Sequence, residues 1–190
     1  FVLHANYYWS WLEDDAFISF RYADNLIQGQ GLVFNPGERV EGYSNFAWVV
    51  LASAALKLGA DPALAARLVG IAGGLLALFL SWRLALKLLP GCGVAATLAP
   101  FVLAVTPLLP RHAVTGLETV PYAALLVGGI LLAAQEPIKR FNPLLPLVLF
   151  ALSLLRPEGV AFALLILGWR CWSCWRSRSA TAPRAELLLF

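Results

Sequence analysis

Six apolar runs follow one another from residue 45 to residue 169, and they restrict this chain to few folds. A helix needs about 20 apolar residues to cross the roughly 30 Å hydrocarbon core of a bilayer. The chain is 60% hydrophobic and 13% charged, whereas soluble domains average about 45–50% and about 25%. We therefore expect an all-α, polytopic transmembrane helix bundle. The runs cover residues 45–58, 63–86, 92–109, 119–134, 143–155 and 159–169.

The runs differ in length, and the short ones are informative. Residues 63–86 and 92–109 are long enough to span a bilayer, and 119–134 is long enough with its flanks. Residues 45–58 would extend only about 21 Å as a helix, at about 1.5 Å per residue. We therefore expect this run to lie in the membrane interface or to re-enter.

The last two runs are shorter still and meet at residues 156–159. Two half-length helices would place this corner below the membrane surface. Irregular backbone at that depth is tolerated only where it is buried in protein or lines a water-filled cavity. The sequence therefore predicts a pocket at this corner.

Basic residues indicate the orientation, because positively charged loops stay in the cytoplasm. They follow the second, fourth and sixth runs. The alternate ends, at residues 61–62, 111–119 and 156–159, then face outward. Residues 1–44 join them outside if 45–58 does not cross the membrane, and we favour that arrangement. The basic residues are Arg83, Lys87, Lys139, Arg140, Arg170, Arg176 and Arg178.

These patterns divide the chain into three parts. Residues 1–62 form the first extracytoplasmic loop, with juxtamembrane helices. Residues 63–170 form a bundle of about five helices, the last two short. Residues 171–190 form a basic cytoplasmic segment that leads to another apolar segment. Because the chain has no Met and starts at Phe1, we expect it to be a fragment of a larger protein.

Three consecutive acids, Glu13, Asp14 and Asp15, precede a predicted amphipathic helix over residues 15–28. One acid is explained as a helix N-cap or as a favourable charge near the positive helix end. Three acids are not. A carboxylate pair beside aromatic residues could supply a general base, so Asp14 and Asp15 are candidate catalytic residues.

Polar residues farther along residues 1–45 are candidates for positioning a substrate. Arg21 and Tyr22 lie on the predicted helix, and the alternative is a solvated helix face. Tyr43 and Asn45 lie in a polar loop and could bind sugar hydroxyls. Between the helix and this loop, Pro36 and Gly37 predict a tight turn.

The two later outward loops carry ionisable residues, which default to a functional hypothesis at membrane depth. Arg111, His112 and Arg156 could hold a phosphate, for which an arginine fork is well shaped. Glu118 and Glu158 are further positioning candidates. The structural alternatives are a helix N-terminal charge for Glu118 and mutual pairing of Arg156 with Glu158.

Several function classes lack their motifs. The chain has no phosphate-binding glycine loop, no zinc-protease motif and no serine-nucleophile elbow. No basic run interleaved with aromatics indicates nucleic acid. Cys171 and Cys174 form a lone CxxC, which falls short of a zinc site and is better explained as packing at a helix end. The pair Gly73 and Gly74 indicates close helix packing.

Three segments in this order resemble the GT-C superfamily of polytopic glycosyltransferases. They are "DDAFISFRYADNLIQGQGLVFNPGERVEGYSNFAW", then "TGLET", then "LLRPEG". The resemblance is nearest to the bacterial arabinofuranosyltransferase-like branch, of the mycobacterial terminal arabinofuranosyltransferase type. It is more distant to the protein O-mannosyltransferases and the aminoarabinose transferase of lipid A.

The resemblance implies inverting transfer of a sugar from a polyprenyl-phosphate donor, on the outer face of the bacterial plasma membrane. The acceptor would be a cell-envelope glycan, lipid or protein. An acid of the first loop, Asp14 or Asp15, would be the base. Some members of the superfamily need a divalent metal, which Glu13, Asp14 and Asp15 could ligate, and others need none.

A competing hypothesis is a membrane protein without catalysis, such as a lipid-linked-sugar translocator or a polysaccharide-export subunit. A translocator predicts polar residues that continue through the bundle towards the cytoplasm. Residues 92–110 and 119–134 contain almost none, which favours the enzyme.

Overall fold

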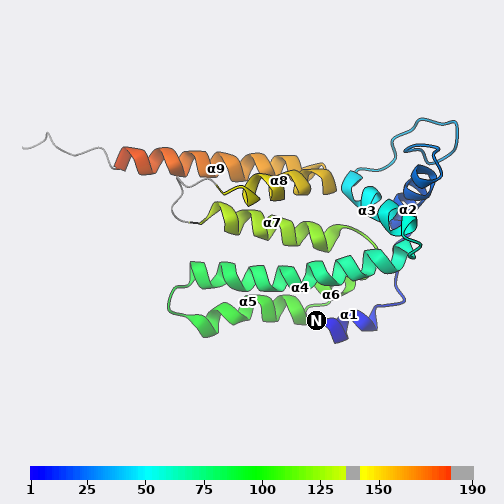
Figure 1. Ribbon diagram of the computed structural model, residues 1–190. Coiled ribbons are helices and arrows are strands. Elements are labelled where there is room, and N and C mark those ends of the chain that lie inside the picture. Colours follow the sequence, from blue (N-terminus) through cyan, green and yellow to red (C-terminus); the bar gives the residue numbers. More distant parts are fainter. Residues whose placement is uncertain (136–141, 181–190) are drawn as a thin grey trace, which may run out of the picture.

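The computed structural model describes residues 1–135 and 142–180, with side chains up to residue 176. Lys139, Arg140, the Arg178 side chain and the apolar segment from residue 181 lie outside this description. Nine helices and no strands form the described part (Figure 1). The helices are α1 (Val2–Tyr7), α2 (Asp14–Ile27), α3 (Phe46–Lys57), α4 (Pro62–Leu88), α5 (Gly93–Val105), α6 (Leu108–His112), α7 (Thr119–Ala133), α8 (Leu144–Leu155) and α9 (Glu158–Ala180).

Helices α4, α5, α7, α8 and α9 form a bundle in which successive helices alternate in direction, and α2 and α3 cover one end of it (Figure 1). The central helix α4 packs against α5 and α7, α7 packs against α8, and α8 packs against α9. Helix α3 contacts α2, α4 and α8, so it joins the end cover to the bundle. The all-helical prediction is confirmed for the described residues.

Helix α4 is the one helix in the described part that is long and apolar enough to cross a membrane, by length and composition. It begins at Asp61, whose carboxylate accepts hydrogen bonds from the backbone N–H groups of Ala63 and Leu64. Pro62 occupies the first helical position, where no N–H is needed. Gly73 lies against Pro121 of α7, and Gly74 lies against Phe1, so the predicted close packing at these glycines is confirmed.

The run at 92–109, predicted as a single span, is two helices. Helix α5 ends at Val105 and α6 begins at Leu108, with Thr106 in an extended conformation between them. Pro107 causes this break, because a proline disfavours the helical conformation of the residue before it. The single span predicted here is therefore wrong.

The sixth run was predicted to be a short helix that ends near residue 169, and this is also wrong. Helix α9 has 23 residues and continues to Ala180. The sequence after Trp169 contains neither glycine nor proline up to that point, so nothing stops the helix. The fifth run does form a short helix, because α8 has 12 residues.

The predicted features of residues 15–37 are present. Helix α2 spans Asp14–Ile27, and Gly29 follows it at a φ of 78°. The turn at Pro36 and Gly37 closes with a hydrogen bond from the Glu38 N–H to the Asn35 carbonyl, at 3.1 Å. Gly37 has a φ of 89°, which a side chain would disfavour.

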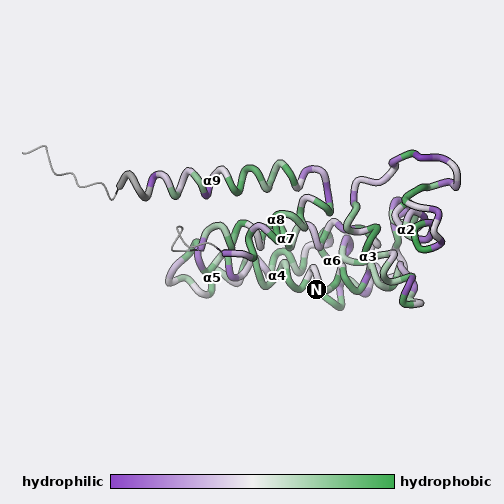
Figure 2. Tube along the Cα trace, turned by 45° about the horizontal axis from the view of Figure 1, so that its top comes forward, coloured by the Kyte–Doolittle hydropathy of each residue, from purple (hydrophilic) through white to green (hydrophobic). Residues whose placement is uncertain are grey.

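Large apolar side chains cover much of the outer surface of the bundle. Leu75 and Phe79 of α4, Phe101 of α5 and Phe150 of α8 are each more than two fifths exposed. Figure 2 shows hydrophobic residues along the bundle and hydrophilic residues in the loop that follows α2. Such a surface is typical of helices that contact lipid.

The polar loops gather at the end of the bundle that α2 and α3 cover (Figure 1). The Glu13 N–H donates to the Thr115 carbonyl at 3.0 Å, which joins the first loop to the 111–118 loop. The start of α9 lies at the same end. The three polar segments therefore meet, and the position of α3 relative to a membrane stays a prediction.

Candidate functional site

A cavity of about 290 Å³ lies where α2, α3, α7 and α8 meet. Half of its lining residues were site candidates from the sequence: Asp15, Tyr43, Asn45, Glu118 and Arg156. The other lining residues are Ile18, Ser19, Gly42, Ser44 and Leu117. Residues far apart in the sequence thus form one polar cavity.

Each polar side chain of the cavity stands at or near a helix terminus. Asp15 is in the first turn of α2, and Ser19 lies one turn later. Asn45 is the N-cap residue of α3, and Glu118 is the N-cap residue of α7. Arg156 follows the last residue of α8 in an extended conformation. The apolar helices therefore hold the polar groups at their ends.

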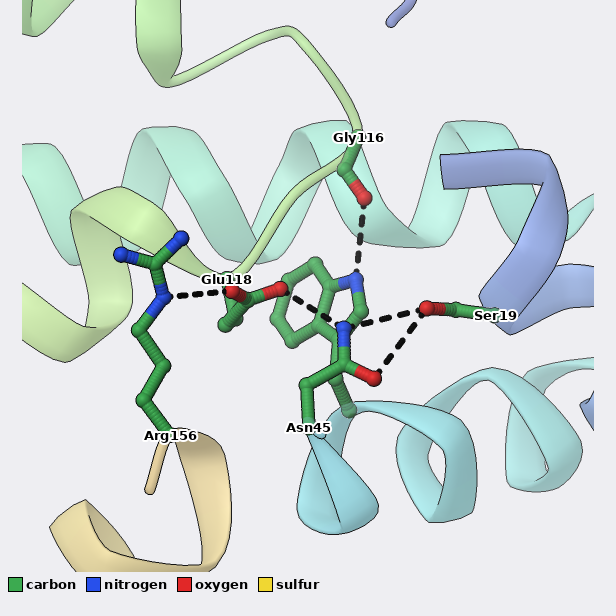
Figure 3. A network of polar contacts seen from close by, with 6 residues as sticks. Ser19, Asn45, Gly116, Glu118 and Arg156 are labelled. Carbon is green, nitrogen blue, oxygen red and sulfur yellow. Dashed lines mark hydrogen bonds and ion pairs between the residues drawn. The ribbon is translucent and has the colours of Figure 1, made fainter. Parts of the chain in front are cut away.

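Glu118 is a buried carboxylate with two partners, and it is only 4% exposed. Its Oε1 accepts a hydrogen bond from Arg156 Nε at 2.7 Å, and its Oε2 accepts one from Asn45 Nδ2 at 2.8 Å (Figure 3). A buried charge is tolerated only when it is paired and hydrogen-bonded. The carboxylate that pairs with Arg156 is therefore Glu118, and Glu158 is exposed.

Asn45 connects Glu118 to helix α2. Its Nδ2 donates to Ser19 Oγ at 3.0 Å, and Ser19 Oγ donates to Asn45 Oδ1 at 3.3 Å. Ser19 is 3% exposed and Asn45 is 8% exposed, so both act in the interior. The pair fixes the first residue of α3 against α2.

Trp48 supports this network from the next turn of α3. Its indole Nε1 donates to the Gly116 carbonyl at 2.9 Å, and the side chain is 1% exposed. Gly116 has a φ of 85°, and a Cβ there would lie 2.7 Å from a methyl carbon of Leu12. The loop before Glu118 can therefore carry only a glycine at this position without strain.

Asp14 and Asp15 are both exposed, but only Asp15 lines the cavity. Both lie in the first turn of α2, where a negative charge is favourable beside the positive helix end. Neither side chain caps the helix, for which Glu13 is the N-cap residue. Because the Asp15 carboxylate does not cap the helix, it is available to a ligand in the cavity.

Tyr43 lines the cavity, and its ring contacts that of Tyr22, with ring centroids 4.8 Å apart. Burial raises the pKa of the Tyr43 hydroxyl above its usual value of 10.0, and the nearby Glu41 charge raises it further. The protonated hydroxyl, which can donate a hydrogen bond, is thus favoured. Tyr43 thus offers a donor to a bound ligand.

Two candidates from α2 hold the following loop and do not line the cavity. The Tyr22 hydroxyl donates to the Val40 carbonyl at 2.8 Å and accepts from the Gly42 N–H at 2.8 Å. Arg21 Nε donates to the Phe34 carbonyl at 3.2 Å. Both residues therefore hold the backbone of the loop that leads to Tyr43 and Asn45.

Arg111 and His112 do not line the cavity. The Arg111 Nη2 lies 3.6 Å from Glu13 Oε1, and its guanidinium stacks 4.7 Å from the Trp11 ring centre. The His112 Nδ1 is buried without a hydrogen-bond partner among the described residues. Arg111 thus contacts the segment before α2, and Arg156 alone of the three cationic candidates lines the cavity.

Sequence reasoning missed Ser19 and Trp48. Ser19 had a signal, because it lies four residues after Asp15 on a predicted helix and thus on the same face. Trp48 had none, because the apolar run around it suggested only a buried aromatic. Its polar role appears only when the loop containing Gly116 is packed beside it.

No group of three or more His, Cys, Asp or Glu side chains in residues 1–135 and 142–176 is placed to hold a metal ion. The acidic triplet Glu13, Asp14 and Asp15 forms no such group, and neither Cys171 nor Cys174 belongs to one.

Comparisons with known proteins give one partial similarity. A segment of 41 residues is 49% identical to the terminal beta-(1->2)-arabinofuranosyltransferase of Mycobacterium tuberculosis. The match covers 22% of this chain and 6% of that enzyme. No family model matches the chain, and no solved structure matches it. Part of the chain is thus similar to a glycosyltransferase.

Proposed function

We propose that this chain belongs to a membrane glycosyltransferase of the GT-C type. It transfers a sugar, arabinofuranose in the first instance, from a polyprenyl-phosphate donor to a cell-envelope glycan, lipid or protein. The reaction inverts the anomeric centre and takes place on the outer face of the bacterial plasma membrane. The partial similarity to an arabinofuranosyltransferase supports the class of reaction and the choice of sugar.

The cavity is the observation that carries this proposal. It places the Asp15 carboxylate and the Arg156 guanidinium on the walls of one space of about 290 Å³. Glycosyl transfer needs a base for the acceptor hydroxyl and a cation for the leaving phosphate. Both groups are supplied here by segments that the fold brings together from opposite ends of the chain.

Asp15 takes the proton from the acceptor hydroxyl, whose oxygen attacks the anomeric carbon. The bond between that carbon and the phosphate oxygen breaks, and the lipid phosphate leaves with the electron pair. Arg156 stabilises the negative charge of the leaving group, because an arginine edge matches phosphate oxygens. The phosphate is already a good leaving group, so no general acid is required.

The outward location of the site is supported by the position of the polar loops. They meet at the end of the bundle covered by α2 and α3, and the basic residues Arg83 and Lys87 lie near the other end of α4 (Figure 1). Basic ends stay in the cytoplasm. The cavity then opens on the opposite side, where lipid-linked sugars are used.

The lining of the larger cavities argues against a translocator. A space of about 430 Å³ between α4, α7 and α9 is lined by apolar side chains, among them Leu84, Leu126 and Phe162. A sugar headgroup that passed through this region would lose its hydrogen bonds to water without replacement. The space between α4, α7 and α9 is therefore unsuited to that passage.

The test replaces the base and keeps the shape. We expect Asp15→Asn to lower sugar transfer from a lipid-linked donor by roughly a hundredfold to ten-thousandfold, the range of general-base catalysis. Asp14→Asn is the matched control, because this neighbour has the same charge and does not line the cavity. Full transfer by Asp15→Asn would remove the base assignment. If only Asp14→Asn lowers sugar transfer, Asp14 and not Asp15 is the general base.

A further inference from the structure

Glu118 lies in the cavity wall, but its two oxygens are already bonded to protein. One is bonded to Arg156 and the other to Asn45, and both of these residues line the cavity themselves. Only 6% of the Glu118 side chain is exposed. Its influence on a ligand therefore passes through its two partners.

The first partner, Asn45, has no N–H left for a sugar. Its amide carries two hydrogens, and Nδ2 donates to both Glu118 Oε2 and Ser19 Oγ. Its Oδ1 accepts from Ser19 and keeps one lone pair. Asn45 can therefore only accept a hydrogen bond from a ligand, which narrows the expectation that it binds sugar hydroxyls.

The second partner, Arg156, keeps one edge of its guanidinium. The Nε–H is used by Glu118, and the two Nη atoms have no hydrogen-bond partner among the described residues (Figure 3). The group is planar, so the bond at Nε fixes the direction of the whole edge. The side chain is 35% exposed, so a ligand can reach it.

We propose that Glu118 is a positioning residue that sets the hydrogen-bond polarity of the cavity. It orients Arg156 so that a single guanidinium edge faces an anion, and it turns Asn45 so that only an acceptor faces sugar hydroxyls. This inference rests on the proposed function for the identity of the anion, which is the phosphate of a prenyl-linked sugar. Glu118 itself contacts neither substrate.

The first variant is Glu118→Gln, which keeps the shape and removes the charge. The new amide can still accept from Arg156, but its NH2 group then faces the Asn45 NH2 group, so the Asn45 amide must turn over to accept from it and would present an N–H to the cavity. The bond to Arg156 also loses its charge assistance. We expect binding of geranylgeranyl monophosphate to the intact protein in detergent to weaken by about tenfold.

The second variant is the double substitution E118Q/N45D, which moves the negative charge to the neighbouring position. The amide at position 118 then accepts from Arg156 and donates to the new carboxylate, which also accepts from Ser19. Every hydrogen bond of the network has a partner again. We expect binding of the monophosphate to recover to within about threefold of the wild type, with the KM of the lipid-linked donor following in parallel.

The control ligand is geranylgeraniol, which has the same chain and no phosphate. We expect the wild type and both variants to bind it equally. The inference is overturned if Glu118→Gln binds the monophosphate like the wild type, or if the double variant does not recover. It is also overturned if both ligands lose affinity together, which would indicate a purely structural role, or if the wild type does not prefer the phosphate.

The two proposals can fail separately. If the wild type binds the monophosphate with this dependence on Glu118 but transfers no sugar, the proposed function fails and the positioning role stands. If transfer requires Asp15 while Glu118→Gln has wild-type binding and KM, the positioning role fails and the proposed function stands.

Discussion

Two cavities between the helices, one at the covered end and one between α4, α7 and α9, differ in what lines them. At the covered end, buried polar side chains from α2, α3, α7 and the α8 terminus bond one another across long stretches of sequence. In the middle of the bundle, the cavity between α4, α7 and α9 is lined by apolar side chains such as Ile130 and Trp169. One region specifies geometry by hydrogen bonds, and the other relies on packing.

This difference predicts different responses to mutation. A buried polar network is sensitive, because the loss of one partner leaves another group unsatisfied. An apolar region accepts exchanges of similar volume at small cost. The following four predictions test this contrast, from the largest expected effect to the smallest.

The largest effect is expected for Arg156→Gln. It leaves the buried Glu118 carboxylate without its cation, and removing one partner of a buried ion pair costs about 3–5 kcal/mol. The free energy of unfolding in detergent measures this loss. Arg111→Gln is the control, because the side chains of Arg111 and Glu13 are 42% and 33% exposed and such a pair contributes about 0–1 kcal/mol. Equal losses would show that the buried network is no more important than the surface pair.

The next effect is expected where the bundle touches the covered end. A Cβ added at Gly70 of α4 would overlap the backbone carbonyl of Ala113, in the loop that leads to Glu118. Gly70→Ala should therefore cost about 2–3 kcal/mol, as overpacking does. Gly168→Ala in α9 meets no atom within 4 Å and should change stability by less than about 1 kcal/mol. Thermal unfolding compares the two, and similar melting temperatures would mean that this contact is easily relaxed.

An aromatic residue in each region provides a third comparison. Trp48→Phe removes the hydrogen bond to Gly116 and leaves a buried carbonyl unsatisfied, at a cost of about 1–3 kcal/mol. Phe162→Leu in the apolar cavity removes no hydrogen bond and should cost less than about 1.5 kcal/mol. The free energies of unfolding of both variants, measured in the same detergent, show which substitution costs more. A larger loss for Phe162→Leu would contradict the expected difference between the polar and the apolar region.

The smallest effect concerns pH. Burial raises the pKa of Tyr43 in the folded state, so the unfolded state loses this proton first as the pH rises through 10.0. Stability contributed by the neutral hydroxyl is present below pH 10.0 and is lost above it. We expect Tyr43→Phe to lose less stability than the wild type between about pH 9 and about pH 11, around the ordinary tyrosine pKa. Parallel pH profiles would show that the hydroxyl is not desolvated.

Much of the architecture could be predicted from local patterns. The turn at Pro36 and Gly37, the helix after Glu13 and the apolar helices follow from residue types and periodicity alone. The break at Pro107 had a signal in the proline itself, but the continuous apolar run obscured it. The length of α9 was underestimated because hydropathy falls after Trp169 while helix propensity does not.

The cavity was predictable in its members and not in its pairings. Asp15, Asn45, Glu118 and Arg156 stood out as polar residues in an apolar chain. Arg156 pairs with Glu118 and not with the nearby Glu158 because of the way α7 and α8 pack. The spacing of residues in the sequence does not predict that packing. The same holds for Arg111, whose neighbours Trp11 and Glu13 come from a distant segment.

The junction between Glu118 and Arg156 also bears on biosynthesis. Arg156 leaves the ribosome after Asp15, Asn45 and Glu118, and Glu118 is the N-cap residue of α7. Until Arg156 is made, the Glu118 carboxylate lacks its cation, and an unpaired buried acid is unfavourable. The pairing of Arg156 with Glu118 therefore forms late in synthesis, because the cation follows its partner by 38 residues in the sequence.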